Sequence, residues 1–397
     1  MKYIFILALL FTIVAKSQQD SISNPTKLNM EAVYDRPFIV NNSTTSIGGY
    51  ITANYFRDVE DGISEGNSFS MPRLTLFVNS NISANINFLT ELEIEEGGKS
   101  IAIEFAALDF VLDQMLTLRG GILMNPIGSF NQNHDDPKWE FARRPVYATQ
   151  LLPATFSSVG FGLYGKSNID NWTFGYEVYL TNGFDEGIID NEQSKTYLPA
   201  VKDNFDRFEE SSNGRPMFTG KISVKNQYLG EVGLSTMLGE YNIYELDGLD
   251  VAEANNLVVF AIDYNNTIPV IDTKIIGEIA WINLEVPNTY ISQYGEKQFG
   301  GYVDIVKPLG KFNFMTFKDI GTNIAFRVDY ADWNVAKFIE TGNNVGDEYF
   351  ALTPGFSLRP DPNTVIRINY SYAWATDFLG NSPTEISSIT IGISSYF

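Results

Sequence analysis

Alternation of apolar and polar residues with a period of two is the feature that most constrains the fold, and it recurs from residue 47 to the end of the chain. Successive side chains of a β-strand point to opposite faces of a sheet, so such a segment predicts a strand with one apolar and one polar face. One example lies near the C-terminus, where Ile366, Ile368, Tyr370, Tyr372 and Trp374 alternate with Arg367, Asn369, Ser371 and Ala373.

Sixteen segments carry this pattern. They lie near residues 47–56, 70–79, 84–95, 100–112, 115–124, 158–166, 172–180, 215–225, 229–239, 256–265, 273–283, 298–307, 322–331, 346–359, 363–374 and 385–397. Unpaired backbone groups in hydrocarbon cost several kcal/mol each, so a sheet can sit in a bilayer only when it is closed. We therefore predict an all-β fold, a transmembrane antiparallel β-barrel of about 16 strands, within a range of roughly 14 to 18.

The lengths of the connections give an independent test, because bacterial barrels have short periplasmic turns at one rim and longer extracellular loops at the other. Every second connection is mostly brief, at 80–83, 113–114, 167–171, 226–228 and 359–362. The alternate connections tend to be long, at 57–69, 125–157, 181–214, 240–255 and 332–345. The exceptions are the short segment 96–99 and the rather long segment 308–321. This sorting favours a barrel over a soluble β-sandwich.

The N-terminus is typical of an exported protein. Lys2 precedes an apolar run over residues 4–15, and Ala15-Lys16-Ser17 offers small residues to a signal peptidase. We predict a signal peptide over 1–17, a polar N-terminal periplasmic segment over 18–46 and an outer-membrane barrel over 47–397. Residues 18–46 are rich in Asn, Ser and Thr, which favours an unstructured tail over a small plug.

The last predicted strand ends on Phe397, on the same face as Ile389, Ile391 and Ile393. This ending resembles the C-terminal signal by which the assembly machinery recognises outer-membrane barrels. We therefore expect the lipid bilayer and that machinery among the partners.

Composition excludes some classes of function. The formal net charge is -21, which argues against nucleic acid as a partner because phosphate binding needs clustered Lys and Arg. The chain has no cysteine, so no disulfide framework stabilises it.

Residues 125–157 form the longest predicted connection between strands apart from 181–214, and loops of this length usually carry a function. It is the third connection on the long-loop rim, the one that in general porins folds inward and narrows the channel. We therefore predict an inward-folded long third loop that forms the constriction. The loop contains His134, Asp135 and Asp136, followed by Lys138, Arg143 and Arg144.

Around this loop the chain resembles the phosphate-selective porin O and P family, in the version found in Bacteroidetes-type genomes. The residues that carry the resemblance are Arg119-Gly120-Gly121, Pro126-Ile127-Gly128, His134-Asp135-Asp136-Pro137, Arg143-Arg144-Pro145, Pro153-Ala154-Thr155 and the segment 160–165. The resemblance implies a sixteen-stranded trimeric channel through which small anions diffuse. It therefore implies small hydrophilic solutes or anions such as phosphate as the cargo, and a homotrimer as the assembly.

Phosphate-selective members of that family line the lumen with a ladder of arginine and lysine, which lowers the barrier to a dehydrated anion. Here the ladder is mixed, because Glu91, Glu93 and Asp329 are predicted to share the inward face with the basic residues. Phosphate selectivity is thus less well supported than membership of the porin class. The residues that we predict to line the pore or its constriction are Arg73, Arg119, Lys138, Arg143, Arg144, Arg327 and Arg367.

Other functions are weaker alternatives. An enzyme at the extracellular rim would have only His134 with Asp135 and Asp136 as general base and partner, and no nucleophile motif accompanies them. A single histidine argues against a metal site, and we predict no cofactor. Acidic pairs such as Asp185-Glu186 are expected to be solvated loop charge. A non-channel barrel that binds a partner, or a transporter of hydrophobic substrates, stays open.

Overall fold

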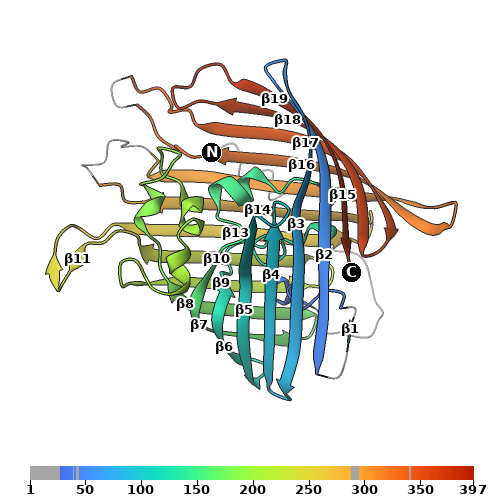
Figure 1. Ribbon diagram of the computed structural model, residues 1–397, viewed down its shortest axis with the longest axis horizontal. Helices are drawn as coiled ribbons and strands as arrows, with labels where there is room; N and C mark the ends of the chain where they lie inside the picture. Colours follow the sequence, from blue (N-terminus) through green and yellow to red (C-terminus); the bar gives the residue numbers. More distant parts are fainter. Residues whose placement is uncertain (1–26, 39, 42–43, 288–294, 339–340) are drawn as a thin grey trace.

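The computed structural model describes residues 27–38, 40–41, 44–287, 295–338 and 341–397. Sixteen long antiparallel strands form a closed barrel, because the last strand, β19, pairs with the first, β2 (Figure 1). The prediction of an all-β barrel of sixteen strands is confirmed. The strands of the barrel are β2 (Thr45–Glu60), β3 (Ile63–Ser83), β4 (Ile86–Glu95), β5 (Ser100–Asp113), β6 (Leu116–Met124), β7 (Ser157–Ile169), β8 (Trp172–Asn182), β9 (Pro216–Asn226), β10 (Gly230–Glu240), β13 (Asn256–Ile268), β14 (Thr273–Leu284), β15 (Lys297–Phe314), β16 (Phe317–Asp332), β17 (Glu348–Asp361), β18 (Thr364–Thr376) and β19 (Thr384–Tyr396).

Within the described residues, three short strands lie outside this set. Strand β1 (Val40–Asn41) pairs with β2 just before the barrel begins. Strands β11 (Glu245–Leu246) and β12 (Leu249–Asp250) form a small hairpin within the connection from β10 to β13.

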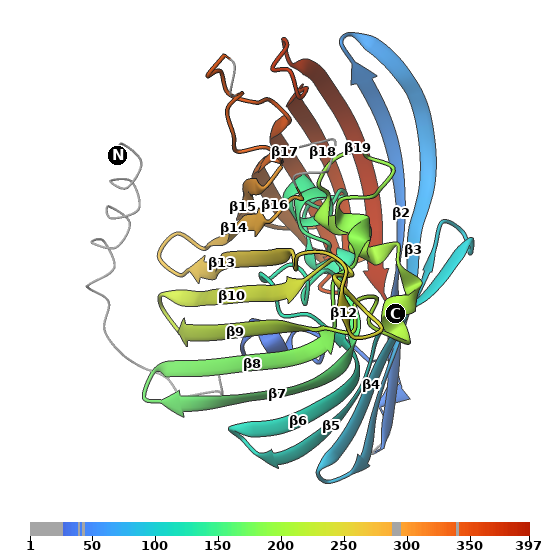
Figure 2. The same cartoon turned by 90° about the vertical axis from the view of Figure 1, so that its left-hand side faces the viewer.

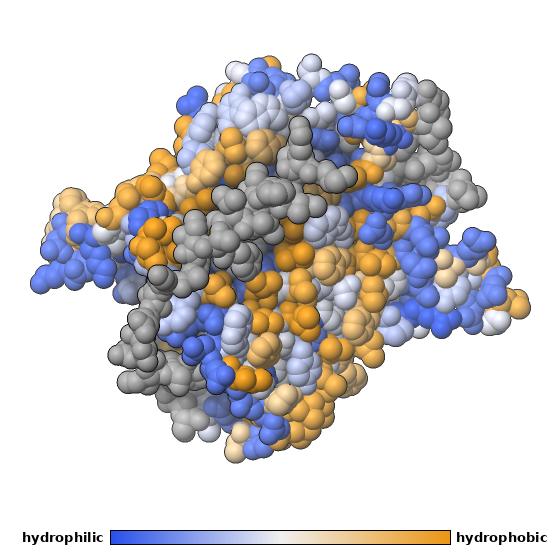
Figure 3. Space-filling model, turned by 180° about the vertical axis from the view of Figure 1, so that it is seen from behind, coloured by the Kyte–Doolittle hydropathy of each residue, from blue (hydrophilic) through white to orange (hydrophobic). Residues whose placement is uncertain are grey.

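The alternation in the sequence becomes an apolar outer and a polar inner face. Along β18, Arg367 and Asn369 point inward and are buried, whereas Ile368 and Tyr370 are nearly half exposed on the outside. Along β19, Ile389, Ile391 and Ile393 are exposed in the same way. Figure 3 shows apolar side chains gathered over the strands on one face of the barrel. This is the arrangement of a barrel with a lipid-facing exterior and a hydrophilic interior.

The two rims differ in the length of their connections. At the short-turn rim the connections are residues 84–85, 114–115, 170–171, 227–229, 269–272, 315–316 and 362–363. At the long-loop rim they are residues 61–62, 96–99, 125–156, 183–215, 241–255, 285–296, 333–347 and 377–383. The predicted sorting of connections by length therefore holds, with two differences.

Two segments that we predicted as loops are strand. Strands β2 and β3 continue through residues 57–69 and meet at a turn of Asp61 and Gly62, both with positive φ, as Asp-Gly hairpin turns require. Strands β15 and β16 likewise continue through 308–321. In both hairpins the ends have exposed side chains on both faces, so nothing there selects for alternation. A prediction based on alternation misses strands of this kind.

The segment before the barrel lies inside it. Leu28, Met30 and Val33 are buried, and the segment contains the short 3-10 helix η1 (Asn29–Glu31). The backbone N–H of Asn29 donates to Glu231 of β10, which faces the lumen. The preference for an unstructured tail is wrong for residues 27–38, which form a small plug. The predicted signal peptide and residues 18–26 lie outside the described residues.

The long connections carry the remaining helices. The third connection contains η2 (Asp136–Lys138) and the π-helical turn η3 (Tyr147–Leu151), and the fourth contains η4 (Glu186–Ile188), η5 (Leu198–Lys202) and η6 (Phe205–Phe208). Figure 2 shows these segments gathered beside the ends of the strands and within the barrel. None of the helices in the described part of the chain is long and apolar enough to cross a membrane.

Candidate pore constriction

The connection 125–156, which we call the inner loop, crosses the lumen soon after it leaves β6. The backbone N–H of Gly128 donates to Ser235 of β10 at 2.9 Å. The N–H groups of Ser129 and Phe130 donate to one carboxylate oxygen of Glu278 in β14, at 2.8 and 3.0 Å. Successive backbone N–H groups form a concave anion site, so the turn binds the Glu278 carboxylate on the far wall.

Gly128 makes this approach feasible. Its φ of +63° lies in the left-handed region, which residues with a Cβ rarely adopt. A Cβ at this position would lie 1.9 Å from a carboxylate oxygen of Glu278. The Pro126-Ile127-Gly128 motif therefore has a steric reason, since only glycine lets the loop turn directly against Glu278.

The middle of the inner loop binds the other side of the barrel. Asp136 accepts a hydrogen bond from Thr52 of β2 at 2.9 Å and pairs with Arg73 of β3 at 3.0 Å. Arg367 of β18 donates to the carbonyl oxygens of Asp136 and Trp139, both at 2.8 Å. The loop thus spans the lumen between opposite walls.

Apolar packing fixes the same loop. The rings of Phe130 and Trp139 lie 5.0 Å apart between centroids and are tilted by 45°, and Tyr302 of β15 lies edge-on to Phe130. Tyr147 and Leu151 belong to the same buried cluster. Burial of these apolar side chains stabilises the folded loop, because each Å² of apolar surface removed from water contributes about 25 cal/mol.

The plug segment and the inner loop are joined by ion pairs. Arg36 donates to both oxygens of Asp135, at 2.9 and 2.7 Å, and to Glu91 of β4 at 2.8 Å. Lys138 donates to the carbonyl oxygen of Ala32 at 3.1 Å. Burial alone would raise the pKa of Asp135, but Arg36 and Lys138 outweigh it and hold the pKa well below its usual range.

The seven residues that we predicted to line the pore all lie on the barrel wall or the inner loop. Six of them are buried or nearly so: Arg73, Arg119, Lys138, Arg144, Arg327 and Arg367. Arg143 differs, because its side chain is 48% exposed while it pairs with Asp58 of β2 at 2.8 Å. Among these seven, Arg143 has the most exposed side chain.

Three of the seven converge on one aspartate of the inner loop. Arg73 pairs with Asp136, Arg144 lies 3.8 Å from the same carboxylate, and Arg367 binds the Asp136 carbonyl. Burial alone would raise the pKa of Asp136, but Arg73, Arg144 and Arg367 hold it below the usual range. Instead of a ladder of free cations, the structure has a network in which cations hold the inner loop.

Two of the other predicted residues lie in separate ion pairs. Arg119 pairs with Asp109 at 2.7 Å and donates to Tyr34 of the plug segment at 2.6 Å. Arg327 pairs with Asp304 at 2.7 Å and donates to the carbonyl oxygen of Arg143 at 2.8 Å. Both arginines therefore connect the wall to a segment inside the barrel.

Sequence reasoning missed Arg36 and Tyr34, because we treated residues 18–46 as polar. The available signal was the group of Val33, Tyr34 and Phe38 around Arg36, which is more apolar than the rest of that segment.

The prediction that Asp185 is a solvated loop charge is wrong. Its side chain is buried and accepts a hydrogen bond from the Gly187 N–H at 2.7 Å at the start of η4.

His134 does not pair with its neighbours in sequence. Its Nε2 lies 3.1 Å from Glu104 of β5 and 3.7 Å from Glu91, while Asp135 and Asp136 bind arginines instead. All three loop residues are buried within the barrel, so they do not form a catalytic group at the rim. Burial lowers the pKa of His134, but Glu104 and Glu91 outweigh it and raise the pKa to about 10.

Comparisons with known proteins bear on the fold. No family model matches the chain. An uncharacterized protein of Aquifex aeolicus is 32% identical over 202 residues, which is 49% of this chain and 44% of that protein. The match thus spans less than half the length of this relative.

Solved structures match over nearly the whole chain. An anion-selective porin from Comamonas acidovorans superposes with a TM-score of 0.57 at 12% identity, covering 90% of this chain and 100% of that one. The fold is that of a porin. OprB of Pseudomonas putida gives 0.55 at 7% identity over 89% and 94% of the two chains. A loop-deletion mutant of OmpT, an outer membrane protein of Vibrio cholerae, gives 0.52 at 9% identity over 89% and 100%.

Proposed function

We propose that this protein is an outer-membrane porin, a passive diffusion channel for small hydrophilic solutes whose lumen is narrowed by the inner loop. The observation that carries the proposal is the path of residues 125–156, which bind Glu278 on one wall and Thr52 and Arg73 on the other. A loop held across a polar lumen restricts passage without contributing to closure of the barrel.

The surface of the barrel supports a location in a membrane. Ile368 of β18, Ile391 of β19 and Phe397, which directly follows β19, are exposed and apolar. A closed barrel satisfies every strand edge, which hydrocarbon demands. As part of this proposal, residues 1–17 are a signal peptide that directs export. The C-terminal aromatic residue is the feature that the assembly machinery recognises.

We further propose that the solutes that pass through the channel are small anions. Small anions, phosphate among them, are favoured by Arg143, which is accessible and lies over the ring of Phe56. The other predicted cations are engaged by acids or carbonyl oxygens, so they hold the constriction and add little free positive charge. The resemblance to the phosphate-selective porin O and P family supports anions and a homotrimer.

A second candidate is a barrel that does not conduct. Two buried apolar clusters fill part of the lumen, one around Phe130 and Trp139 and one around Val33 and Phe105. Packing of this kind is expected of a barrel that only presents loops to a partner. We propose no enzymatic activity for either candidate.

Planar-bilayer recording of the purified protein under a salt gradient, repeated with phosphate, tests the proposal. We expect discrete conductance steps, and a reversal potential that reports whether anions or cations pass. A chain that lacks residues 27–38 serves as comparison and should conduct more than the wild type, because the plug has been removed. If neither chain conducts after insertion, the non-conducting candidate is correct.

A further inference from the structure

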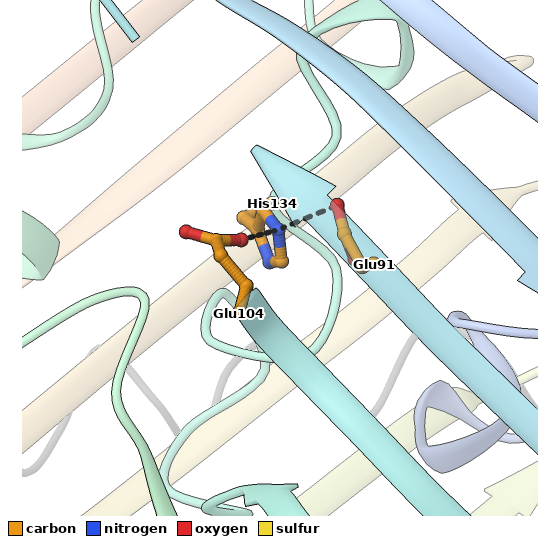
Figure 4. A group of neighbouring side chains, drawn as sticks. All are labelled: Glu91, Glu104 and His134. Atoms are coloured by element: carbon orange, nitrogen blue, oxygen red, sulfur yellow. Dashed lines mark ion pairs between the residues drawn. The ribbon is translucent and has the colours of Figure 1, made fainter. Parts of the chain in front are cut away.

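Three side chains converge at the junction of the inner loop and the wall. Glu91 comes from β4, Glu104 from β5 and His134 from the inner loop (Figure 4). One ligand atom from each lies within 4.8 Å of the other two. The sequence has one histidine, and we took this as an argument against a metal site. In the structure, two carboxylates from the strands join His134, so three possible metal ligands lie together.

A β-bulge places Glu104 in this group. Glu91 pairs with Phe105 and Leu92 with Ile103, so Glu104 is the extra residue of β5. Inward residues Phe105, Ala107 and Asp109 set the phase of the strand, and strict alternation would turn Glu104 outward. Instead Glu104 is buried beside Phe105. Bulges commonly re-aim one side chain next to a functional site.

Each of the three groups is held by its other polar atom. Glu91 accepts from Arg36 through Oε2, and Glu104 accepts from Thr155 through Oε1. Nδ1 of His134 lies 2.9 Å from the carbonyl oxygen of Asn131, so Nδ1 carries the hydrogen and donates it. Metal-binding histidines and carboxylates are oriented by outer partners of these kinds.

The atoms that remain face one another without hydrogen bonds. Oε1 of Glu91, Oε2 of Glu104 and Nε2 of His134 are buried, and none has a hydrogen-bond partner. Nε2 lies 3.1 Å from Oε2 of Glu104 and 3.7 Å from Oε1 of Glu91, so a protonated His134 forms ion pairs with both carboxylates. One imidazole nitrogen and two carboxylate oxygens, all buried, therefore converge on one point, where a metal cation can replace the proton that the imidazole carries in the ion pair.

We propose that Glu91, Glu104 and His134 bind one divalent transition-metal ion, with Zn²⁺ as the best fit. Zinc binds imidazole nitrogen and carboxylate oxygen at about 2.0–2.2 Å, which separates neighbouring ligand atoms of a tetrahedral ion by about 3.4 Å. Nε2 lies 3.1 and 3.7 Å from the two oxygens, on either side of that value. The ion would also offset the charge of two carboxylates brought together away from water.

The bound ion links three parts of the barrel. It would join the inner loop, through His134, to β4 and β5, beside the ion pair from Arg36 to Glu91. This role goes beyond the proposed channel, because a metal clamp stabilises the loop whether or not solutes pass. It also departs from the sequence-based prediction of no cofactor.

Metal content of the full-length protein in detergent tests the proposal. The protein is stripped with a chelator, incubated with ZnCl₂, separated from free metal and analysed by mass spectrometry. We expect about one Zn²⁺ per chain in the wild type, and at least a fivefold loss in Glu104→Gln and His134→Ala. Ca²⁺ should not be retained, because it requires six to eight oxygen ligands.

Glu177→Gln is the matched control, because Glu177 is also a buried lumenal glutamate but bonds to Gln132 and Tyr179 instead. It should retain the full metal content. Glu104→Gln preserves side-chain shape, so it remains informative if His134→Ala fails to fold. Zinc should raise the thermal unfolding midpoint of the wild type and leave that of Glu104→Gln unchanged.

A wild type that retains no zinc overturns the proposal and assigns the cluster to a protonated histidine between two carboxylates. Equal zinc content in the wild type and Glu104→Gln overturns it as well. Neither measurement uses conductance, so failure of the metal site and failure of the proposed channel are distinguishable.

Discussion

Arg36 and Asp135 form a two-pronged ion pair, with Nε donating to one carboxylate oxygen at 2.9 Å and a terminal nitrogen donating to the other at 2.7 Å. The two residues lie 99 positions apart, one in the plug segment and one in the inner loop. Their side chains are 1% and 0% exposed. This contact makes the plug and the constriction a single unit.

Replacing Arg36 with alanine should destabilise that unit. Asp135 and Glu91 would both lose a buried guanidinium, and breaking a buried ion pair costs about 3–5 kcal/mol. We expect a lower midpoint of denaturant unfolding and faster proteolysis of residues 27–38. Lys27→Ala is the control, since Lys27 pairs with Asp35 at the surface and should change little. Equal stability of the two variants would contradict the role of Arg36.

Gly128→Ala should loosen the inner loop. The substitution adds strain at positive φ, about 1–2 kcal/mol, and a clash with Glu278 that should add about 1–3 kcal/mol. Gly62→Ala provides the comparison, because Gly62 has a φ of +81° but open space around its Cα. Denaturant unfolding of both variants separates the two effects. The close approach to Glu278 would be unimportant if both variants lost the same stability.

Reversing the charge at Arg143 should alter ion selectivity and leave the fold intact. Arg143→Glu would place a second acid beside Asp58, so the ratio of anion to cation permeability should fall on the order of twofold or more. The reversal potential under a salt gradient measures this ratio. Arg57→Glu makes the same change of charge on an outward-facing, exposed position of β2 and should leave the ratio unchanged. An unchanged reversal potential in Arg143→Glu would place Arg143 away from the pathway.

Asp185 should give the fourth connection an unusual pH dependence. Burial raises its pKa above the ordinary value of 3.8, although the Gly187 N–H opposes this. A carboxyl whose pKa is raised on folding contributes stability that is present below its unfolded pKa and lost as pH rises through the folded value. Asp185→Asn keeps the acceptor for Gly187 and removes the charge. Its thermal midpoint should therefore rise relative to the wild type as pH increases from about 3 to about 7.

Asp190 supplies the control for this measurement, because it lies in the same connection with an exposed side chain. Asp190→Asn should follow the wild type at every pH. A constant difference between Asp185→Asn and the wild type across the range would show that ionisation of Asp185 does not affect stability.

Most of the architecture could be predicted because strand periodicity is local. The positions of Ile368 and Arg367 in the alternation are enough to predict that the first side chain points outward and the second inward. Because this choice of face fixes the orientation of the strand, the orientation of each strand in the barrel could be predicted too. The third connection could be placed from its length and its Pro-Ile-Gly and His-Asp-Asp motifs. Alternation did not predict the strand within 57–69 and 308–321, because residues 60–69 and 308–319 are exposed on both faces and alternation arises only where one face is buried.

The sequence by itself determined the strands, their orientation and the loop that enters the lumen, since each depends on neighbours in the chain. Only the tertiary structure decided what the charged residues do. Arg36 reaches Asp135 and Glu91, Arg367 reaches Asp136, and the bulge turns Glu104 toward His134. These partners lie far apart in sequence and come into contact because the barrel closes. Alternation therefore predicts which charged side chains point inward. Which opposite charge each of them pairs with depends on the closed barrel.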